Sequence, residues 1–224
     1  MTLFLLNLTL LASLIPINLN DWKSTKMSGK SYPKFEVLDS KLKISTQEDA
    51  GGLLYLFEGS AYETNGEVDL SWDWKVAQFP QNSDWSIITK DNDDSPIRIG
   101  VLISDPKSKS IPVPKSLKLG LGRKSKKVSH IIFYSAIPGG NIGAQFQVSP
   151  YQEKILYCLL PASKTFMKQS VAPLNDFRKF FRANDKTNNS SVEIIGLWVF
   201  ADSDNLKGSS QAYLKNLSFA GTSP

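Results

Sequence analysis

The chain has 224 residues, of which 41% are apolar and 11% aromatic, and its formal net charge is +5. This length and apolar content allow one complete hydrophobic core, as in all-β sandwiches of similar size. A single cysteine, Cys158, excludes an internal disulfide, and a single histidine, His130, excludes a histidine-rich zinc site.

The first 19 residues are almost wholly apolar, with a leucine-rich run from Leu3 to Ile17. This run is shorter than the roughly 20 residues that a membrane-spanning helix needs. Such a run is typical of a secretory signal. We therefore predict a signal segment over residues 1–20, a single domain over 30–224, export to the periplasm and no stable membrane span. The alternatives are a lasting membrane anchor and translation from Met27, which would leave a cytoplasmic protein.

The sequence from Val68 to Val76 alternates strictly between apolar and polar residues, which predicts a strand with one face in the core and the other in water. Trp72 and Trp74 fall on the apolar face. Core packing is the first interpretation of this pair, and an aromatic platform for a sugar ring is the second. Trp85 stands in the polar stretch 81–90, where we expect it to line a site carried by a loop.

One helix is predicted over residues 174–182, because Phe177, Phe180 and Phe181 repeat at helical spacing just after Pro173. Its candidate capping residues are Asn175 and Asp176. The remaining pattern gives about ten short strands separated by turns. We predict an all-β fold, a jelly-roll-like two-sheet β-sandwich with one short helix.

Positive charge is concentrated in one segment. Eight basic residues and no acidic one fall between Lys107 and Lys127, so the rest of the chain carries a net charge of −3. No aromatic residues interleave with these charges, and proline, serine and glycine are frequent. The segment therefore predicts a solvated loop rather than a nucleic-acid surface. We expect no nucleic-acid partner.

Neither Cys158 nor His130 is predicted to be catalytic. Cys158 lies in the apolar run 155–160, as a small core residue would, and His130 lies inside the strand-like segment 128–135. A Ser-His-Asp triad would have to use His130, and the sequence has no G-x-S-x-G elbow.

Two acidic turns carry the functional signal. The first, Asp91–Asp94, precedes a strand, and the second, Asp202–Asn205, joins the two strands of the segment Val192–Phe219. Loops at one end of a sandwich cluster in space. If both turns lie at the same end, these side chains converge: Asp91, Asp93, Asp94, Asp202, Asp204 and Asn205.

Three interpretations of such a cluster remain open. Oxygen ligands suit calcium, which would lie at Asp93, Asp202 and Asp204, although neither turn has the length of an EF-hand loop. Arg98 is an internal cation that would replace the metal, so no cofactor is the first expectation. Alternatively, the acidic residues only hydrogen-bond to loop amides as Asx turns.

Several motifs resemble the DUF3047 family of bacterial proteins of unknown function. They occur in family order and are Leu70–Val76, Asp93–Val101, Asp176–Phe181, Asp202–Asn205 and Gln211–Tyr213. The similarity covers about residues 35–219. The resemblance implies an exported bacterial protein with a sandwich fold, and it implies no particular activity.

Three function hypotheses follow. The first is a module that binds carbohydrate or an envelope glycoconjugate, because carboxylates and amides pair with neighbouring hydroxyls while aromatic rings cover sugar faces. The second is a hydrolase of glycosidic or ester bonds, with Asp94 and Asp202 as acid and base about 5 to 9.5 Å apart. The third is a structural envelope protein. The predicted ligand-binding residues are Trp85, Asp93, Asp94, Arg98, Asp202, Asp204 and Asn205.

Overall fold

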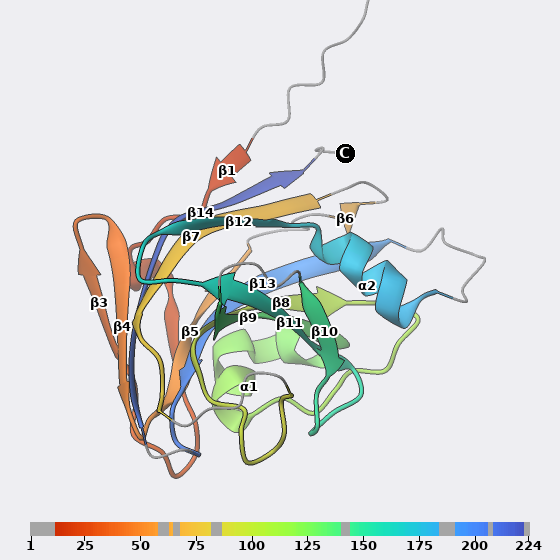
Figure 1. The fold of residues 1–224 in the computed structure, drawn as a ribbon. Helices are drawn as coiled ribbons and strands as arrows, with labels where there is room; N and C mark the ends of the chain where they lie inside the picture. The colour runs from red at the N-terminus through yellow and green to blue at the C-terminus, as the bar shows by residue number, and fades with distance from the viewer. Residues whose placement is uncertain are drawn as a thin grey trace, which may run out of the picture.

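The computed structural model describes residues 12–57, 63–64, 68–81, 87–139, 144–183, 191–205 and 208–221. In this part of the chain, two β-sheets face one another and two α-helices lie against them (Figure 1). The predicted all-β, jelly-roll-like sandwich is confirmed. The prediction of a single helix is wrong, because a second helix forms inside the basic segment.

The six-stranded sheet has the order β12-β7-β14-β4-β3, with β1 added to β14. Strand β7 alternates between buried and more exposed residues as predicted, and both Trp72 and Trp74 point into the core between the sheets. Neither tryptophan is available as a sugar platform. The strands are β1 (Ala12–Leu14), β3 (Lys34–Leu38), β4 (Lys41–Gln47), β7 (Val68–Gln78), β12 (Met167–Val171) and β14 (Ser209–Gly221).

The eight-stranded sheet has the order β10-β11-β9-β8-β13-β5-β2, with β6 added to β13. Its central strands are nearly continuous apolar runs, because the six-stranded sheet covers one face and a second apolar cluster covers the other. The strands are β2 (Lys23–Lys26), β5 (Ala50–Leu56), β6 (Glu63–Thr64), β8 (Ser95–Ser104), β9 (His130–Pro138), β10 (Gln145–Val148), β11 (Ile155–Ala162) and β13 (Val192–Asp202).

The pairing of β8 with β13 positions the acidic turns. The two strands are antiparallel neighbours, with Ser95 opposite Asp202. The turn that precedes β8 and the turn that follows β13 therefore leave the sheet at the same end. This register is the reason that residues about 110 positions apart in the sequence meet.

Helix α1 (Lys115–Leu121) and the 3-10 helix η2 (Gly122–Lys126) occupy the segment that the charge pattern predicted as a solvated loop. Leu117 and Leu121, four residues apart, are buried in the apolar cluster on the outer face of the eight-stranded sheet. The loop prediction failed because the surrounding basic residues mask the one-sided apolar pattern that Leu117 and Leu121 make.

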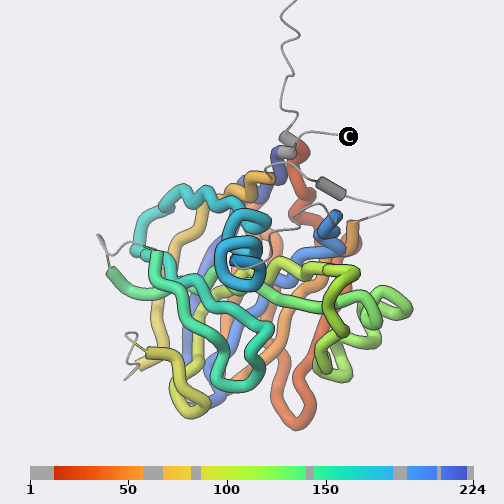
Figure 2. Tube along the Cα trace, turned by 90° about the vertical axis from the view of Figure 1, so that its right-hand side faces the viewer, coloured from red at the N-terminus to blue at the C-terminus, as the bar shows by residue number. Residues whose placement is uncertain are grey.

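Helix α2 (Pro173–Phe181) matches the predicted helix and lies well apart from α1 (Figure 2). Leu174 and Phe177 are buried in the core between the sheets. The predicted cap is wrong, because no side chain caps the helix and Pro173 occupies its first turn. Asp176 instead accepts a 2.7 Å hydrogen bond from the Tyr134 hydroxyl.

Part of the predicted signal segment belongs to the sandwich. Strand β1 pairs with β14 near the C-terminal end of the chain (Figure 1), and Ile15 lies in the core between the sheets. A short 3-10 helix, η1 (Leu19–Asp21), leads into β2 at the edge of the eight-stranded sheet. Among the described residues, none of the helices has the length and apolar character needed to cross a membrane.

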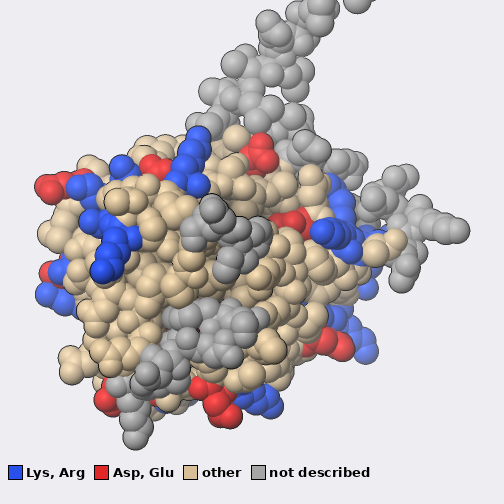
Figure 3. Space-filling model, viewed as in Figure 1, with Lys and Arg blue, Asp and Glu red and all other residues tan. Residues whose placement is uncertain are grey.

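Charged side chains of both signs are interspersed over the face of the molecule seen in Figure 3. Large uncharged areas separate them.

Candidate functional site

A cavity of about 450 Å³ opens on the outer face of the eight-stranded sheet, beside the segment that leads into α1. Neighbouring strands supply its aromatic floor, because alternate side chains of a strand point to the same face. The floor residues are Phe133 from β9, Tyr157 from β11, and Trp198 and Phe200 from β13. Their rings contact one another in pairs, with centroids 4.7 to 5.6 Å apart for three of the pairs.

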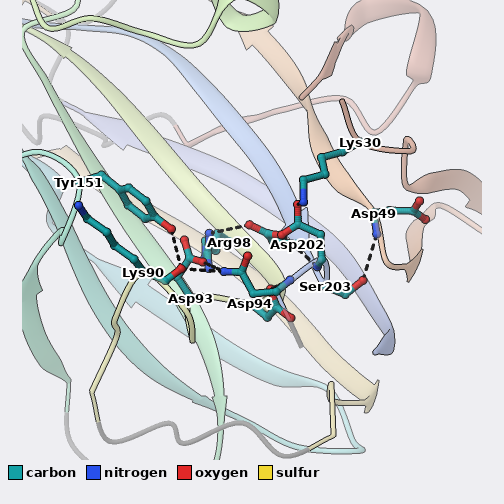
Figure 4. Close-up of polar contacts among 11 residues, drawn as sticks. Lys30, Asp49, Lys90, Asp93, Asp94, Arg98, Tyr151, Asp202 and Ser203 are labelled. Atoms are coloured by element: carbon teal, nitrogen blue, oxygen red, sulfur yellow. Dashed lines mark hydrogen bonds and ion pairs between the residues drawn. The ribbon is translucent and has the colours of Figure 1, made fainter. Parts of the chain in front are cut away.

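One wall of the cavity is formed by the two acidic turns, which Asn205 ties together. The Asn205 side-chain amide donates to Asp93 and to the Lys90 carbonyl, the latter at 3.1 Å. The Asn205 backbone N–H donates to Asp94 at 3.1 Å. The predicted convergence of the two turns is therefore confirmed, and Figure 4 shows Asp93, Asp94 and Asp202 gathered around Arg98. Asp91, which was predicted to join them, is exposed and does not line the cavity.

Arg98 is the buried cation of this wall. Its side chain rises from β8 between Tyr157 and Phe200, with the guanidinium carbon 5.3 and 5.8 Å from the two ring centroids. One terminal nitrogen lies 3.8 Å from an Asp202 oxygen. Arg98 is only 2% exposed, and within the described residues its Nε and Nη2 have no hydrogen-bond partner. Because these two nitrogens are buried away from solvent, a ligand in the cavity does not reach them, and the guanidinium contributes its positive charge to the wall.

Asp93 and Asp202 are carboxyls with raised pKa values. Burial raises the pKa of Asp202 well above its usual value, and the Arg98 charge only partly opposes this effect. The pKa of Asp93 is raised by burial as well, again against the pull of Arg98, with Asp94 and Asp204 adding to the rise. Each of the two residues is less than 10% exposed. The wall therefore offers carboxyl groups that hold protons more tightly than exposed ones.

The rim of the cavity is more open. Tyr151, which is 55% exposed, donates from its hydroxyl to the Lys90 carbonyl at 3.0 Å. Across the cavity, the Lys30 ammonium lies 2.7 Å from an Asp204 oxygen. Figure 4 shows Lys30 and Tyr151 on opposite sides of the carboxylate group. These contacts position a phenol and an ion pair where a ligand would enter.

The predicted site residues differ in their placement. Asp94 is buried behind the wall, next to a small hollow of about 10 Å³ that it shares with Arg98 and Ser135, and it does not line the cavity. Trp85 lies outside the described residues, so its predicted role stays a prediction. The predicted residues that line the cavity are Asp93, Arg98, Asp202, Asp204 and Asn205.

Sequence reasoning missed the aromatic floor and both rim residues, Lys30 and Tyr151. A signal for part of the floor was present, because Trp198, Phe200 and Asp202 alternate along one strand and must share a face. No comparable signal marks Lys30 or Tyr151, which approach the cavity only through the fold.

The family described as "Protein of unknown function (DUF3047)" matches residues 20–218 of the chain. The chain belongs to the DUF3047 family. No curated protein is a significant match to it.

Among solved structures, this DUF3047 chain is similar to carbohydrate-binding modules and to xyloglucanases at low identity. A family 11 carbohydrate-binding module of a cellulosomal cellulase of Clostridium thermocellum has 12% identity and a TM-score of 0.45, with 95% of each chain covered. A family 12 xyloglucanase from Bacillus licheniformis has 9% identity and a TM-score of 0.46, with 94% of this chain and 99% of the other covered. The xyloglucanase domain of a type three effector from Sinorhizobium fredii has 10% identity and a TM-score of 0.45, with 89% and 92% covered.

The carboxylates of this DUF3047 site also have the chemistry of a cation site. Asp93, Asp94 and Asp202 each place an oxygen within 4.8 Å of the others, whereas Asp204 is paired with Lys30. Oxygen donors of this kind suit calcium. Arg98, however, already brings a positive charge to the same carboxylates. The donor set therefore fits a metal only if the guanidinium moves aside.

The single histidine and the single cysteine lie away from this cavity. His130 is buried between the rings of Phe177 and Phe181, 4.9 and 4.6 Å away, and burial lowers its pKa to about 4. Cys158 is buried between the two sheets, where burial raises the pKa of its thiol. Both environments favour the uncharged form of the side chain, as expected for core residues.

Proposed function

We propose that this protein binds a carbohydrate or glycoconjugate in the cavity on its eight-stranded sheet. The observation that carries the proposal is one cavity with an aromatic floor and a wall that combines carboxyls with a buried guanidinium. Sugar rings present apolar C–H faces and many hydroxyls, and each hydroxyl both donates and accepts. Aromatic rings suit the first feature, and paired acceptors and donors suit the second.

The dimensions of the cavity support the same ligand class. Its volume of about 450 Å³ falls in the usual range for small-molecule sites, about 300 to 1,000 Å³. The polar groups are few and lie on one wall and the rim, which would orient a ring over the aromatic floor. Asp202 and Asp93 would pair with hydroxyl protons of the ligand, while Arg98 would supply positive charge beside these carboxyls.

Glycan-array binding followed by calorimetry on the best oligosaccharide tests this proposal. We expect the Asp204→Ala and Tyr151→Phe variants to weaken binding by about tenfold each, because each removes a polar contact worth about 1 to 1.5 kcal/mol. Neither change touches the aromatic floor, so the fold should be kept.

Asp73→Ala is the matched control. Asp73 also pairs with a partly exposed lysine, Lys215 at 4.0 Å, but it lies on the outer face of the six-stranded sheet. This variant should bind as the unchanged protein does. Equal binding by all four proteins, or no array signal at all, would overturn the proposal. The third hypothesis, a structural envelope protein, would then gain support if pull-downs from the envelope identify a strong partner.

A second candidate function is hydrolysis of a glycosidic or ester bond by two carboxyls. The favourable observation is that Asp93 and Asp202 place oxygens within 4.8 Å of one another and both have raised pKa values. Asp94, paired with Asp202 in the sequence-based hypothesis, does not line the cavity. Turnover of a polysaccharide or ester panel that disappears in both Asp93→Asn and Asp202→Asn would establish catalysis. Binding of a glycan without any turnover would contradict the hydrolase and support the binding module.

We also propose that the protein acts outside the cytoplasm, in the periplasm of a bacterium, after export by its apolar N-terminal run. The support is the apolar run itself, from Leu3 to Ile17. A glycan or envelope glycoconjugate would be encountered in that compartment.

A further inference from the structure

A second hollow adjoins the cavity. Met27, Ser28 and Pro114 line both, so the two form one continuous depression that runs from the acidic wall towards α1. A ligand longer than a single ring can therefore extend from the cavity into the second hollow without leaving the protein surface.

The two ends of this depression differ in charge. The first end is lined by Asp93, Asp202 and Asp204, and the cations Lys30 and Arg98 of the same cavity lie beside these carboxylates. The second hollow is lined by Lys26 and Lys115 and by no acidic residue among those described. Both lysines are exposed, and within the described residues neither takes part in an ion pair. Their charges are therefore open to a partner that is not part of the chain.

Hydroxyl groups accompany the lysines. Ser24 and Ser28, which are both exposed, line the same hollow, and Ser116 lines it as well. Ammonium and hydroxyl groups together bind the oxygens of carboxylate, sulfate and phosphate groups. At the first end the cations Lys30 and Arg98 already lie beside carboxylates, so Lys26 and Lys115 in the second hollow are the cations open to an anionic group of the ligand, which gives the ligand a defined direction.

We infer that the second hollow is a subsite for an anionic substituent, and that the ligand is an acidic saccharide bearing a carboxylate, sulfate or phosphate group. This inference rests on the proposed carbohydrate binding and adds the ligand class. The uncharged part of the ligand lies over the aromatic floor, and the anionic group lies between Lys26 and Lys115.

The test is an array on which each uronate, sulfated or phosphorylated oligosaccharide stands beside its neutral counterpart, made by carboxyl reduction, desulfation or dephosphorylation. We expect the acidic member of the best-bound pair to bind at least about tenfold more tightly at low salt. The preference should shrink as salt rises, because the lysines are exposed. It should disappear in the double variant Lys26→Ala/Lys115→Ala.

Lys118→Ala/Lys126→Ala is the matched control, since it removes two exposed basic residues of the same helical segment that do not line the hollow. It should keep the preference. Equal binding of acidic and neutral members, or a preference that survives in Lys26→Ala/Lys115→Ala, would overturn the anionic subsite while leaving carbohydrate binding intact. Failure of every glycan to bind would overturn both. Comparison of the uronate, sulfated and phosphorylated oligosaccharides on the array then identifies whether a carboxylate, a sulfate or a phosphate group is recognised.

Discussion

At the residue scale, Asp202 connects the electrostatics of the site to the stability of the fold. Its carboxyl is buried at the end of β13, near both Asp93 and Arg98, and burial raises its pKa. The folded protein therefore binds this proton more tightly than the unfolded chain does. As pH rises from about 3.8 towards the raised pKa, the folded state loses stability relative to the unfolded state.

We expect the Asp202→Asn variant to lose this pH dependence. Its free energy of unfolding should fall less steeply than that of the unchanged protein as pH rises above about 4, by up to about 1.4 kcal/mol per pH unit where one proton differs. Urea unfolding between pH 4 and 8 measures the two curves. Parallel curves would show that the Asp202 carboxyl titrates normally. The variant also lacks the Asp202 carboxyl beside Arg98. This loss lowers its free energy of unfolding but adds no dependence on pH, because asparagine does not titrate.

Calcium provides a second test at the same residues. We predict that the unchanged protein melts at the same temperature in millimolar calcium chloride and in EDTA, because Arg98 already places a positive charge beside Asp93, Asp94 and Asp202. In Arg98→Ala the carboxylates lose that cation, and calcium should then raise the melting temperature through binding to the folded state. A calcium-dependent rise in the melting temperature of the unchanged protein would instead establish a calcium site. It would contradict the view that Arg98 takes the place of a metal.

At the element scale, α1 explains why a basic, proline-containing segment is part of the fold. Leu117 is fully buried against the eight-stranded sheet, whereas Leu119, two residues further on, is 74% exposed. The helix therefore presents Leu117 and Leu121 to the sheet and Leu119 to water. The same side of the molecule carries the second hollow, so the helix also shapes the proposed anionic subsite.

We expect Leu117→Ala to reduce the free energy of unfolding by about 2 to 5 kcal/mol, the usual cost of emptying a buried leucine site. Leu119→Ala, the matched exposed change, should alter it by no more than about 0.5 kcal/mol. Chemical denaturation of the two variants measures both values. Similar small effects would mean that the segment behaves as the solvated loop that its composition predicts.

At the scale of the whole molecule, the N-terminal region links export to folding. Cleavage of a signal segment near residue 20 would remove β1 and take Ile15 out of the core between the sheets. Strand β14, however, would keep its partners β4 and β7. Loss of β1 would leave residues 218–220 of β14 without a partner on one edge, because β4 pairs only with residues 209–214, but β7 would still pair along the other edge of the strand.

We therefore predict that the mature protein is found in the periplasmic fraction, and that it begins near residue 20 and still folds. N-terminal sequencing of the purified protein, together with cell fractionation and circular dichroism, measures all three properties. A cytoplasmic protein that retains Met1 or starts at Met27 would contradict export. A start at Met27 would also remove β2, whose Thr25 hydroxyl accepts from the Trp198 indole at 2.8 Å beneath the cavity.

The sequence by itself determined the sandwich, the strands on either side of the acidic turn and the helix, which was predicted over 174–182 and lies over 173–181, because periodicity and turn residues act locally. The sequence also predicted which two turns form the site, because Asp93 lies in one of them and Asp202 and Asn205 lie in the other. Only the tertiary structure decided that β8 and β13 are neighbours, that Asp94 faces away from the cavity, and that Tyr151 and Lys30 form its rim. Strand order and side-chain approach depend on contacts between residues far apart in the chain, and a single sequence does not record them.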